Sequence, residues 1–502
     1  SLAPAGPNAN DGPDDNRPET VRPIPPVGKP QEAATLERLR QASIELATRL
    51  ARFRETGAAE LRPLWTDVEI FRRAVRIAVD QDGFFGDQDV AAAERMLAEG
   101  SKRLDQLERG EAPWTRASGL IVRGYVSELD DSVQPYGLVI PAGWSPDATG
   151  TMPLDLWFHG RGETLGELQF LDQRMTQPGQ FAPAEAIVLH PYGRYCNANK
   201  FAGEVDVFEA LDSVRSRYRI DDDRIAVRGF SMGGASAWHL AVHDPGRWAA
   251  ANPGAGFSET PEFLQTFQGE TLRPYWWERR LWRWYDATDW ASNLRHVPTV
   301  AYSGEKDRQI QAADAMSRAA AAEGLGLVHL IGPDTGHSYH PATAVETERR
   351  VRRLVKLGRR RVPREIDFVT YTLRYARMGW IEVQGLAEHW ERGRVRGRLS
   401  DGAIELEVEG ITALDLIFEP GTFPFVSEPE IRVRHRRQDR TIESVITFGD
   451  GSLPTTTLLA TDRSWHCRLV AGDSGWRLRT DADEIGLRKR PGLQGPIDDA
   501  LM

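Results

Sequence analysis

The amino-acid sequence predicts an α/β protein with a mostly parallel sheet that is covered by helices on both faces. After residue 150, short apolar runs recur, each long enough for one buried strand: LDLWFHG, AIVLHPYG, RIAVRGFS, AAANPGAG, TVAYSGE and LVHLIGPD. Segments with helical spacing, such as VDVFEALDSVRSRY and GASAWHLAVHD, lie between these runs. This alternation is typical of parallel strands joined by helical crossovers.

The chain on either side of this region has a different character. Before it, LERLRQASIELATRLARF places leucines at mixed spacings of three and four, which predicts a helical N-terminal segment. Two strand-like runs that follow Trp114 are separated by Asp130 and Asp131 and predict an antiparallel pair. From about Glu365, alternating β-branched residues between Gly and Asp turns predict a small C-terminal antiparallel β domain. The predicted division is a leader over 1–31, a helical segment over 32–113, the α/β domain over 114–360 with a Trp-rich insertion at 258–295, a β domain over 361–480 and a tail over 481–502.

Composition restricts the classes of partner. The 63 Lys and Arg residues are outnumbered by 73 Asp and Glu residues, and the basic residues are scattered, so we expect no nucleic-acid partner. No run approaches the roughly 20 apolar residues that cross a bilayer, so we expect no membrane partner. Cys196 and Cys467 are too few for a disulfide framework or a Cys-rich metal site, although one bridge between them stays open. The Pro- and Gly-rich leader predicts disorder and would fit an extracytoplasmic or secreted protein whose signal peptide has been removed.

The strongest local signal is the run RIAVRGFSMGGASAWHLAVH. It places Gly229, Ser231 and Gly233 in a G-x-S-x-G motif between a buried strand and a helix. A nucleophilic serine needs this sharp strand-to-helix turn, and glycines on both sides let the backbone fold tightly enough to expose the hydroxyl. We therefore predict that Ser231 is a nucleophile.

A serine hydroxyl needs a base to take its proton and a carboxylate to orient that base. Asp307 follows the strand TVAYSGE, and His337 follows the strand LVHLIGPD. The order Ser, Asp, His matches the α/β-hydrolase arrangement, with each residue at the carboxyl end of a strand. Glu305 is the alternative acid and His340 the alternative base.

The oxyanion of the reaction needs backbone donors. We predict that they come from Met232, which follows the nucleophile, and from Gly160, Arg161 and Gly162 in an HG-type turn.

Further residues could line the substrate pocket. Tyr192 and Arg194 follow the AIVLH strand, and Trp276, Trp277 and Trp282 lie in the Trp-rich insertion. Exposed aromatic faces can stack on sugars or aromatic rings, but packing or ordinary loop structure explains these residues equally well.

Two histidines four apart suggest zinc ligation only superficially. His239 and His243 have the spacing of zinc proteases, but no glutamate lies between them to activate water, so we interpret them as ordinary helix residues. We expect no metal and no organic cofactor.

With these motifs in place, residues Leu154 to Arg352 resemble secreted bacterial carboxylesterases of the feruloyl-esterase and polyhydroxybutyrate-depolymerase-like branch. They are also similar to the catalytic domain of the prolyl oligopeptidase superfamily. The resemblance rests on HGRGE, GFSMGG, SGEKD and TGHSYHP and implies an α/β-hydrolase fold. It implies a serine carboxylesterase acting through an acyl-enzyme on a small-molecule or carbohydrate ester, for example an acyl or aryl ester of carbohydrate. A peptidase of the oligopeptidase type and a non-catalytic carbohydrate-binding protein are the alternatives, although the β-propeller of true prolyl oligopeptidases has no counterpart here.

Overall fold

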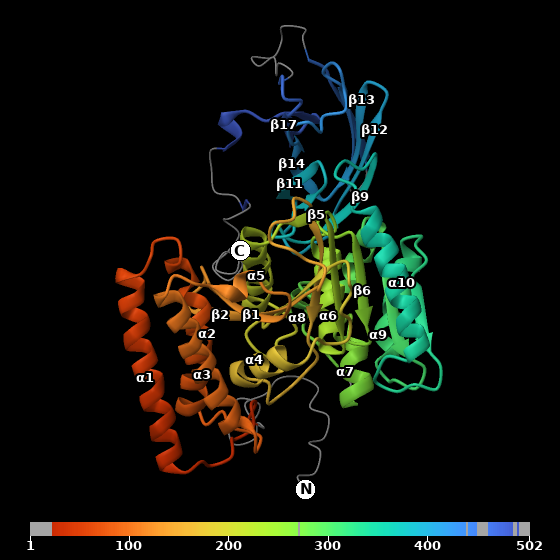
Figure 1. The fold of residues 1–502 in the computed structure, drawn as a ribbon. Helices are drawn as coiled ribbons and strands as arrows, with labels where there is room; N and C mark the ends of the chain where they lie inside the picture. The colour runs from red at the N-terminus through yellow and green to blue at the C-terminus, as the bar shows by residue number, and fades with distance from the viewer. Residues whose placement is uncertain (1–22, 270–271, 438–439, 449–459, 485–488, 491–502) are drawn as a thin grey trace. The chain divides into compact units, whose positions relative to one another are not determined.

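The computed structural model describes residues 23–269, 272–437, 440–448, 460–484 and 489–490 (Figure 1). Most of the predicted leader and tail lies outside the described residues. Contacts divide the chain into two compact units, the first formed by Ser1–Ala237 and Asn252–Gly256, the second by Trp238–Ala251 and Phe257–Met502. The five-part division of the chain stays a prediction.

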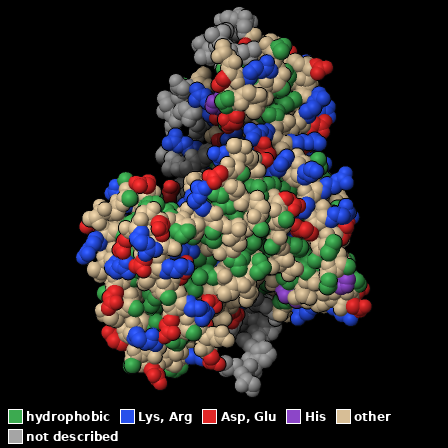
Figure 2. All heavy atoms as spheres, viewed as in Figure 1, with side chains coloured by type: hydrophobic (Ala, Val, Ile, Leu, Met, Phe, Trp, Pro, Cys, Tyr) green, Lys and Arg blue, Asp and Glu red, His purple; other side chains and the backbone are tan. Residues whose placement is uncertain are grey.

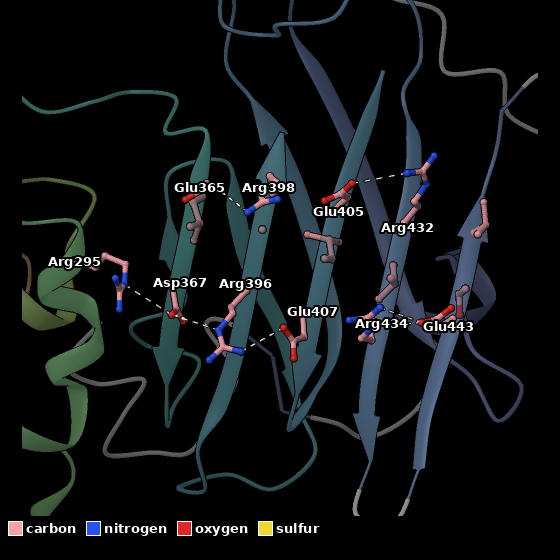
Figure 3. Close-up of a pocket in the computed structure, with 16 residues that line it drawn as sticks. Arg295, Glu365, Asp367, Arg396, Arg398, Glu405, Glu407, Arg432, Arg434 and Glu443 are labelled. Carbon is pink, nitrogen blue, oxygen red and sulfur yellow. Dashed lines mark hydrogen bonds and ion pairs between the residues drawn. The ribbon is translucent and has the colours of Figure 1, made fainter. Parts of the chain in front are cut away.

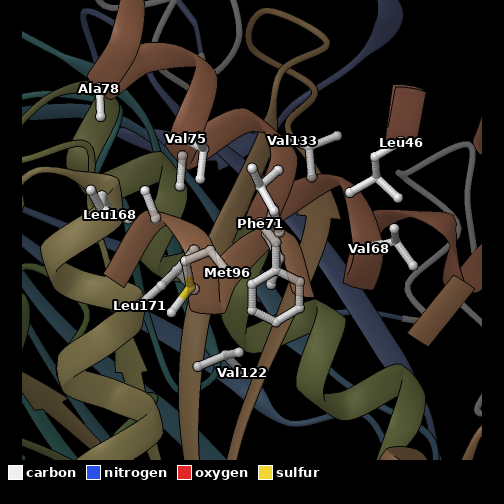
Figure 4. Close-up of a cluster of buried hydrophobic side chains, with 14 of the residues drawn as sticks. Leu46, Val68, Phe71, Val75, Ala78, Met96, Val122, Val133, Leu168 and Leu171 are labelled. Atoms are coloured by element: carbon white, nitrogen blue, oxygen red, sulfur yellow. The ribbon is translucent and has the colours of Figure 1, made fainter. Parts of the chain in front are cut away.

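The first unit begins with the predicted helices. They are α1 (Ala33–Thr56), η2 (Arg62–Trp65), α2 (Thr66–Asp80), α3 (Asp89–Glu108) and η3 (Pro113–Thr115). Their apolar side chains share one core with residues of the first two strands and of the helix α4 (Glu167–Thr176). Figure 4 labels ten members of this core: Leu46, Val68, Phe71, Val75, Ala78, Met96, Val122, Val133, Leu168 and Leu171. Each fully buried side chain of this size contributes about 1.5–3 kcal/mol, so the helices are an integral part of this unit.

A mixed sheet forms the centre of the first unit. Its strands are β1 (Gly119–Val126), β2 (Val133–Ile140), β3 (Met152–Phe158), β4 (Ile187–Pro191) and β5 (Ile220–Phe230), and the order is β1-β2-β4-β3-β5-β6. The pairs β1–β2 and β2–β4 are antiparallel, whereas β4, β3 and β5 run parallel. The helix α5 (Ala202–Arg217) joins β4 to β5, and α6 (Met232–His243) follows β5. The strand β6 (Ala250–Gly254) is divided between the two units.

The second unit continues with β6-β7-β8, in which β7 (Val300–Gly304) pairs in parallel with β8 (Val328–Gly332). Its helices are α7 (Pro261–Gln268), α8 (Trp276–Trp282), η4 (Ala287–Arg295), α9 (Ile310–Ala322) and α10 (Pro341–Leu357).

The C-terminal part of the second unit consists of two antiparallel-rich sheets of five strands each. One has the order β10-β11-β14-β17-β18, formed by β10 (Arg377–Met378), β11 (Ile381–Leu386), β14 (Ile411–Phe418), β17 (Trp465–Ala471) and β18 (Trp476–Leu478). The other has the order β16-β15-β13-β12-β9, formed by β16 (Arg440–Ile446), β15 (Glu430–Arg437), β13 (Ala403–Glu409), β12 (Gly393–Ser400) and β9 (Glu365–Thr370). A short helix, η5 (Asp481–Glu484), follows β18. Buried side chains of both sheets form one apolar core.

The other face of the second sheet carries charges in stripes (Figure 3). Arginines on β12 lie opposite glutamates on β13, which in turn lie opposite arginines on β15: Arg396 pairs with Glu407 and Arg432 with Glu405. On the edge strands, Glu365 pairs with Arg398 and Glu443 with Arg434. This face is therefore charged but locally neutral.

The α/β-hydrolase-like sheet, the N-terminal helices and the C-terminal antiparallel sheets confirm the predicted fold class. Figure 2 shows basic and acidic side chains intermingled over the visible face, in keeping with the scattered charges of the sequence. Within the described residues, no helix is both long and apolar enough to cross a bilayer. Cys196 and Cys467 are both free thiols, so the bridge that the sequence left open is not formed.

Candidate active site

Ser231 occupies the turn between β5 and α6 in the first unit. Its φ of 59° lies in the left-handed region, which residues other than glycine seldom adopt. Its amide donates to the carbonyl of Gly254 at 2.9 Å, and its own carbonyl accepts from the amide of Gly234 at 2.8 Å. These bonds hold a strained turn of the kind that presents a nucleophilic hydroxyl.

Both glycines of the motif are required by close backbone approach. A Cβ atom at Gly229 would lie 2.2 Å from the carbonyl oxygen of Gly233, and a Cβ at Gly233 would lie 2.0 Å from that of Phe158. Neither position has room for a side chain, so the tight turn at Ser231 depends on both glycines.

The predicted oxyanion donors differ in what they contact. Gly160 lies beside the nucleophile, since a Cβ atom there would be 3.5 Å from the Cβ of Ser231. The amide of Gly162 donates to the sulfur of Cys196 at 3.2 Å and is therefore already engaged. The amides of Gly160 and Arg161 form no hydrogen bond with any residue that the structure describes. Met232 is the first residue of α6, where backbone amides have no partner inside the helix.

Asp307 and His337 meet in the second unit. The Nδ1 atom of His337 lies 2.7 Å from Oδ2 of Asp307, and the other carboxylate oxygen accepts the amide of Gln309 at 2.9 Å. Asp307 is only 6% exposed. With the proton on Nδ1 donated to the carboxylate, the lone pair of the ring is on Nε2, the arrangement that a general base needs.

The ends of β7 and β8 bring these two side chains together. The amide of Glu305 donates to Gly332 and that of Lys306 to Thr335, which ties the two loops to each other. A Cβ atom at Gly304 would lie 2.1 Å from the carbonyl oxygen of Gly336. The histidine loop can therefore cross the end of β7 only because glycine ends that strand.

The alternative acid and base have other partners. The carboxylate of Glu305 is exposed and accepts the amide of Asp334 at 2.8 Å. His340 precedes α10, and its Nδ1 atom lies 3.3 Å from the hydroxyl of Thr343. The geometry thus favours Asp307 and His337 over both alternatives.

A strained loop that contacts α6 was not predicted from the sequence. Six residues between 193 and 201 have positive φ values: Gly193, Arg194, Tyr195, Ala198, Asn199 and Phe201. The buried hydroxyl of Ser236, in α6, lies 2.8 Å from both the carbonyl oxygen of Ala198 and Oδ1 of Asn199. Gly193 and Asn199 are residue types that could have indicated it, because Gly and Asn tolerate the left-handed region better than most residues.

Tyr192 and Arg194, predicted at the pocket, contact protein groups. Tyr192 is 6% exposed, belongs to the core of the N-terminal helices and packs its ring against Phe170 at 5.0 Å. The guanidinium of Arg194 bonds to Asp130 at 2.6 Å and to Asp206 at 2.9 Å. Hydrogen bonding to Arg194 holds the pKa of the Asp130 carboxyl well below its usual range.

The tryptophans of the insertion differ in their exposure to solvent. Trp276 and Trp277 in α8 are 69% and 46% exposed. Trp282 lines a hollow of about 590 Å³ together with Arg279 and Arg283. Trp290, in contrast, is fully buried.

His239 and His243 belong to a cluster of aromatic rings in the second unit. The ring of His243 stacks on Tyr375 with centroids 3.8 Å apart, and His239 meets Tyr285 edge to face at 5.1 Å. Both histidines thus contribute to aromatic packing.

Part of the chain matches the model of a known protein family. Residues 197–356 match the model of the prolyl oligopeptidase family, and this segment contains Ser231, Asp307 and His337. No curated protein sequence is similar enough to match the chain.

Solved structures give more distant likenesses. A candidate dipeptidyl aminopeptidase IV from Bacteroides ovatus is 14% identical, with a TM-score of 0.36, over 48% of this chain and 36% of that chain. A ferulic acid esterase is 17% identical, with a TM-score of 0.36, over 48% of this chain and 99% of the esterase. An S-formylglutathione hydrolase from Agrobacterium tumefaciens is 16% identical, with a TM-score of 0.35, over 47% of this chain and 94% of the hydrolase. These likenesses say nothing of the substrate.

Proposed function

We propose that this protein, whose residues 197–356 match the prolyl oligopeptidase family, is a serine hydrolase that acts as a carboxylesterase. In the proposal, Ser231 is the nucleophile, His337 the general base and Asp307 the residue that orients it. The observation that carries the proposal is the 2.7 Å contact between a buried carboxylate and the Nδ1 atom of His337. The strained turn at Ser231 supports it independently.

The proposed reaction has two halves. His337 takes the hydroxyl proton of Ser231 through Nε2 while Oγ attacks the ester carbonyl carbon. The amides of Met232, Gly160 and Arg161 stabilise the negative charge on the carbonyl oxygen. The imidazolium then gives its proton to the departing alkoxide, which leaves an acyl group on Ser231. Water repeats the sequence, with His337 again acting as base, and releases the carboxylic acid.

Chemistry favours esters over amides at such a site. An amide nitrogen must be protonated before it can leave, whereas an alkoxide or phenoxide leaves more readily. The chain before β1 folds as helices in the described residues, so no propeller that selects peptides precedes the hydrolase sheet there. The family match keeps a peptidase as the second candidate.

A covalent probe and a substrate panel test the proposal. A fluorophosphonate should label the wild-type protein and leave Ser231→Ala unlabelled. Nitrophenyl acetate and methyl ferulate should be cleaved faster than a dipeptide nitroanilide and a prolyl amide. An unlabelled wild-type protein would favour the non-catalytic alternative, and faster cleavage of the prolyl amide would favour the peptidase.

A further inference from the structure

The second unit contains a large cleft. Its volume is about 1270 Å³. The turn after α6, the end of η4, the segment that follows α10 and the strands β9 and β12 supply its walls. No residue assigned above to catalysis or to the substrate pocket lines it.

The cleft has a local excess of positive charge. Five arginines line it, namely Arg295, Arg359, Arg360, Arg364 and Arg398, against two carboxylates, Glu365 and Asp401, which leaves an excess of three. His296 adds no charge near neutral pH, because burial lowers the pKa of its imidazole. This excess contrasts with the chain as a whole, which carries a net charge of −10.

Of the five arginines, Arg360 and Arg364 have no carboxylate partner among the described residues, whereas Arg295 and Arg398 each contact one. On the neighbouring sheet face the charges are matched, and Arg398 pairs with Glu365 at 3.2 Å (Figure 3). Arg295 reaches Asp367 at 3.9 Å. Arg360 and Arg364 are exposed and form no ion pair with any residue that the structure describes.

A second hollow adjoins the first at the same segment. Its volume is about 410 Å³, and it shares Gly246 and Arg359 with the larger cleft. Arg359 donates to the carbonyl of Gly246 at 2.9 Å, which fixes the start of the segment 359–364 against the turn after α6. Arg247, Arg361 and Arg377 line this hollow together with Asp244 and Glu419. Arg247 pairs with Asp244 and Arg377 with Glu419.

We infer that the cleft binds a small molecule that carries several carboxylate or phosphate groups. Concave walls of low dielectric concentrate the field of like charges and attract counter-ions. Guanidinium groups bind carboxylate and phosphate oxygens in a bidentate manner. The volume exceeds that of a single inorganic ion and is large enough for an oligosaccharide or another organic polyanion. This binding is separate from the proposed ester hydrolysis.

Calorimetric titration with three probes tests the inference. Tripolyphosphate supplies phosphate groups, trigalacturonate supplies carboxylates, and maltotriose is a neutral control of similar size to the latter. At about 20 mM salt we expect at least one of the anions to bind with a Kd near or below ~1 mM, and about tenfold more weakly at ~300 mM salt. Maltotriose should give no heat. The anion that binds shows whether the cleft recognises phosphate groups or carboxylate groups.

Two variants decide whether the binding occurs in this cleft. Arg360→Gln/Arg364→Gln should weaken anion binding by about tenfold or more, because both unpaired guanidinium groups are lost. Arg52→Gln is the control, since Arg52 is exposed on α1 and its side chain forms no ion pair with the described residues. It should change the Kd by less than about twofold.

Three outcomes would overturn the inference. They are the absence of anion binding up to about 10 mM at low salt, unchanged binding by the double variant, and equal weakening by Arg52→Gln. Thermal melts of both variants show whether they are folded. Hydrolysis of nitrophenyl acetate should be unchanged in the double variant, so failure here leaves the proposed esterase function unaffected.

Discussion

At the scale of the residue, the left-handed backbone of Ser231 limits what a substitution there can change. Alanine and serine experience similar strain at a φ of 59°, and the half-buried side chain contributes little packing. Ser231→Ala should therefore keep its melting temperature and lower kcat/KM for esters by about 10⁴-fold or more. Ester kinetics and a thermal melt measure both. Near-normal hydrolysis by the variant would exclude Ser231 as the nucleophile.

Asp307 and Glu305 form a matched pair of acids on one loop. Asp307→Asn removes the carboxylate that meets His337 and should lower kcat by about 10⁴-fold. Glu305→Gln changes an exposed side chain that only accepts the amide of Asp334, and should change kcat by less than about threefold. Combining Asp307→Asn with Ser231→Ala should add little, because the residues act as one unit. A crippled Glu305→Gln variant would reverse the assignment of the acid.

The sequence predicted these residues because their signals are local. The G-x-S-x-G spacing around Ser231 and the short loops after β7 and β8 are visible without any knowledge of packing. The positive φ values of Arg194 and Tyr195 could not be predicted in this way, because neither Arg nor Tyr favours the left-handed region. The burial of Tyr192 depends on the N-terminal helices, which lie far away in the sequence. Whether Tyr192 lines the pocket or packs in the core therefore depends on long-range packing, which the local sequence pattern does not contain.

At the scale of the element, Ser236 ties α6 to the strained loop. Ser236→Ala would remove the buried hydroxyl proton, which can be donated to either the carbonyl of Ala198 or Oδ1 of Asn199, at a cost of about 1–3 kcal/mol. Urea unfolding measures this loss. Ser216→Ala is the control, because Ser216 is exposed on α5, and it should change stability by less than ~0.5 kcal/mol. Similar losses in the two variants would show that the tether contributes nothing.

The exposed tryptophans of α8 are expected to contact substrate rather than the core. Trp276→Ala/Trp277→Ala should raise KM for methyl ferulate more than for nitrophenyl acetate, because rigid aromatic faces bind planar groups. Their exposure predicts little change in melting temperature. Trp290→Ala, at a fully buried position, should instead cost about 3–5 kcal/mol. Equal effects of the double variant on both esters would contradict a role in aryl recognition.

Sequence patterns predicted the elements better than the orientation of their side chains. The alternation of apolar runs and helical segments identified β3 to β8 and the helices α5 and α6. The Trp-rich insertion, however, contains both exposed Trp276 and buried Trp290. The helix α8 has only seven residues, too few for hydrophobic periodicity to distinguish its two faces.

At the scale of the whole molecule, three histidines with lowered pKa values, one buried and two partly buried, make stability depend on pH. Burial lowers the pKa of His190 in the first unit and of His296 and His329 in the second. Each ring binds a proton less readily in the folded chain than in the unfolded chain, where it is protonated below about pH 6.5. Stability is therefore fully present above that pH and is lost as the pH falls.

His190 provides the clearest test, because it is almost completely buried. Its contribution should decrease by about 1.4 kcal/mol between pH 7.5 and pH 5.5. His190→Gln should lower the acid sensitivity of urea unfolding by about that amount, whatever the variant costs at pH 7.5. An unchanged difference between the two pH values would show that folding does not lower the pKa of His190.

The charge stripes of the second β sheet have a consequence for how its strands find their register. A slip of one residue would turn the three arginines of β12, Arg394, Arg396 and Arg398, into the apolar core, at a prohibitive desolvation cost. A slip of two residues would keep every arginine outside and would leave two of the three opposite a glutamate, because the charged residues of β12 are all arginines and those of β13 are all glutamates. The two-residue turn between Ser400 and Ala403, where Gly402 has a φ of 74°, must therefore exclude even slips. Gly402→Val should populate a misregistered intermediate and slow the refolding of this sheet.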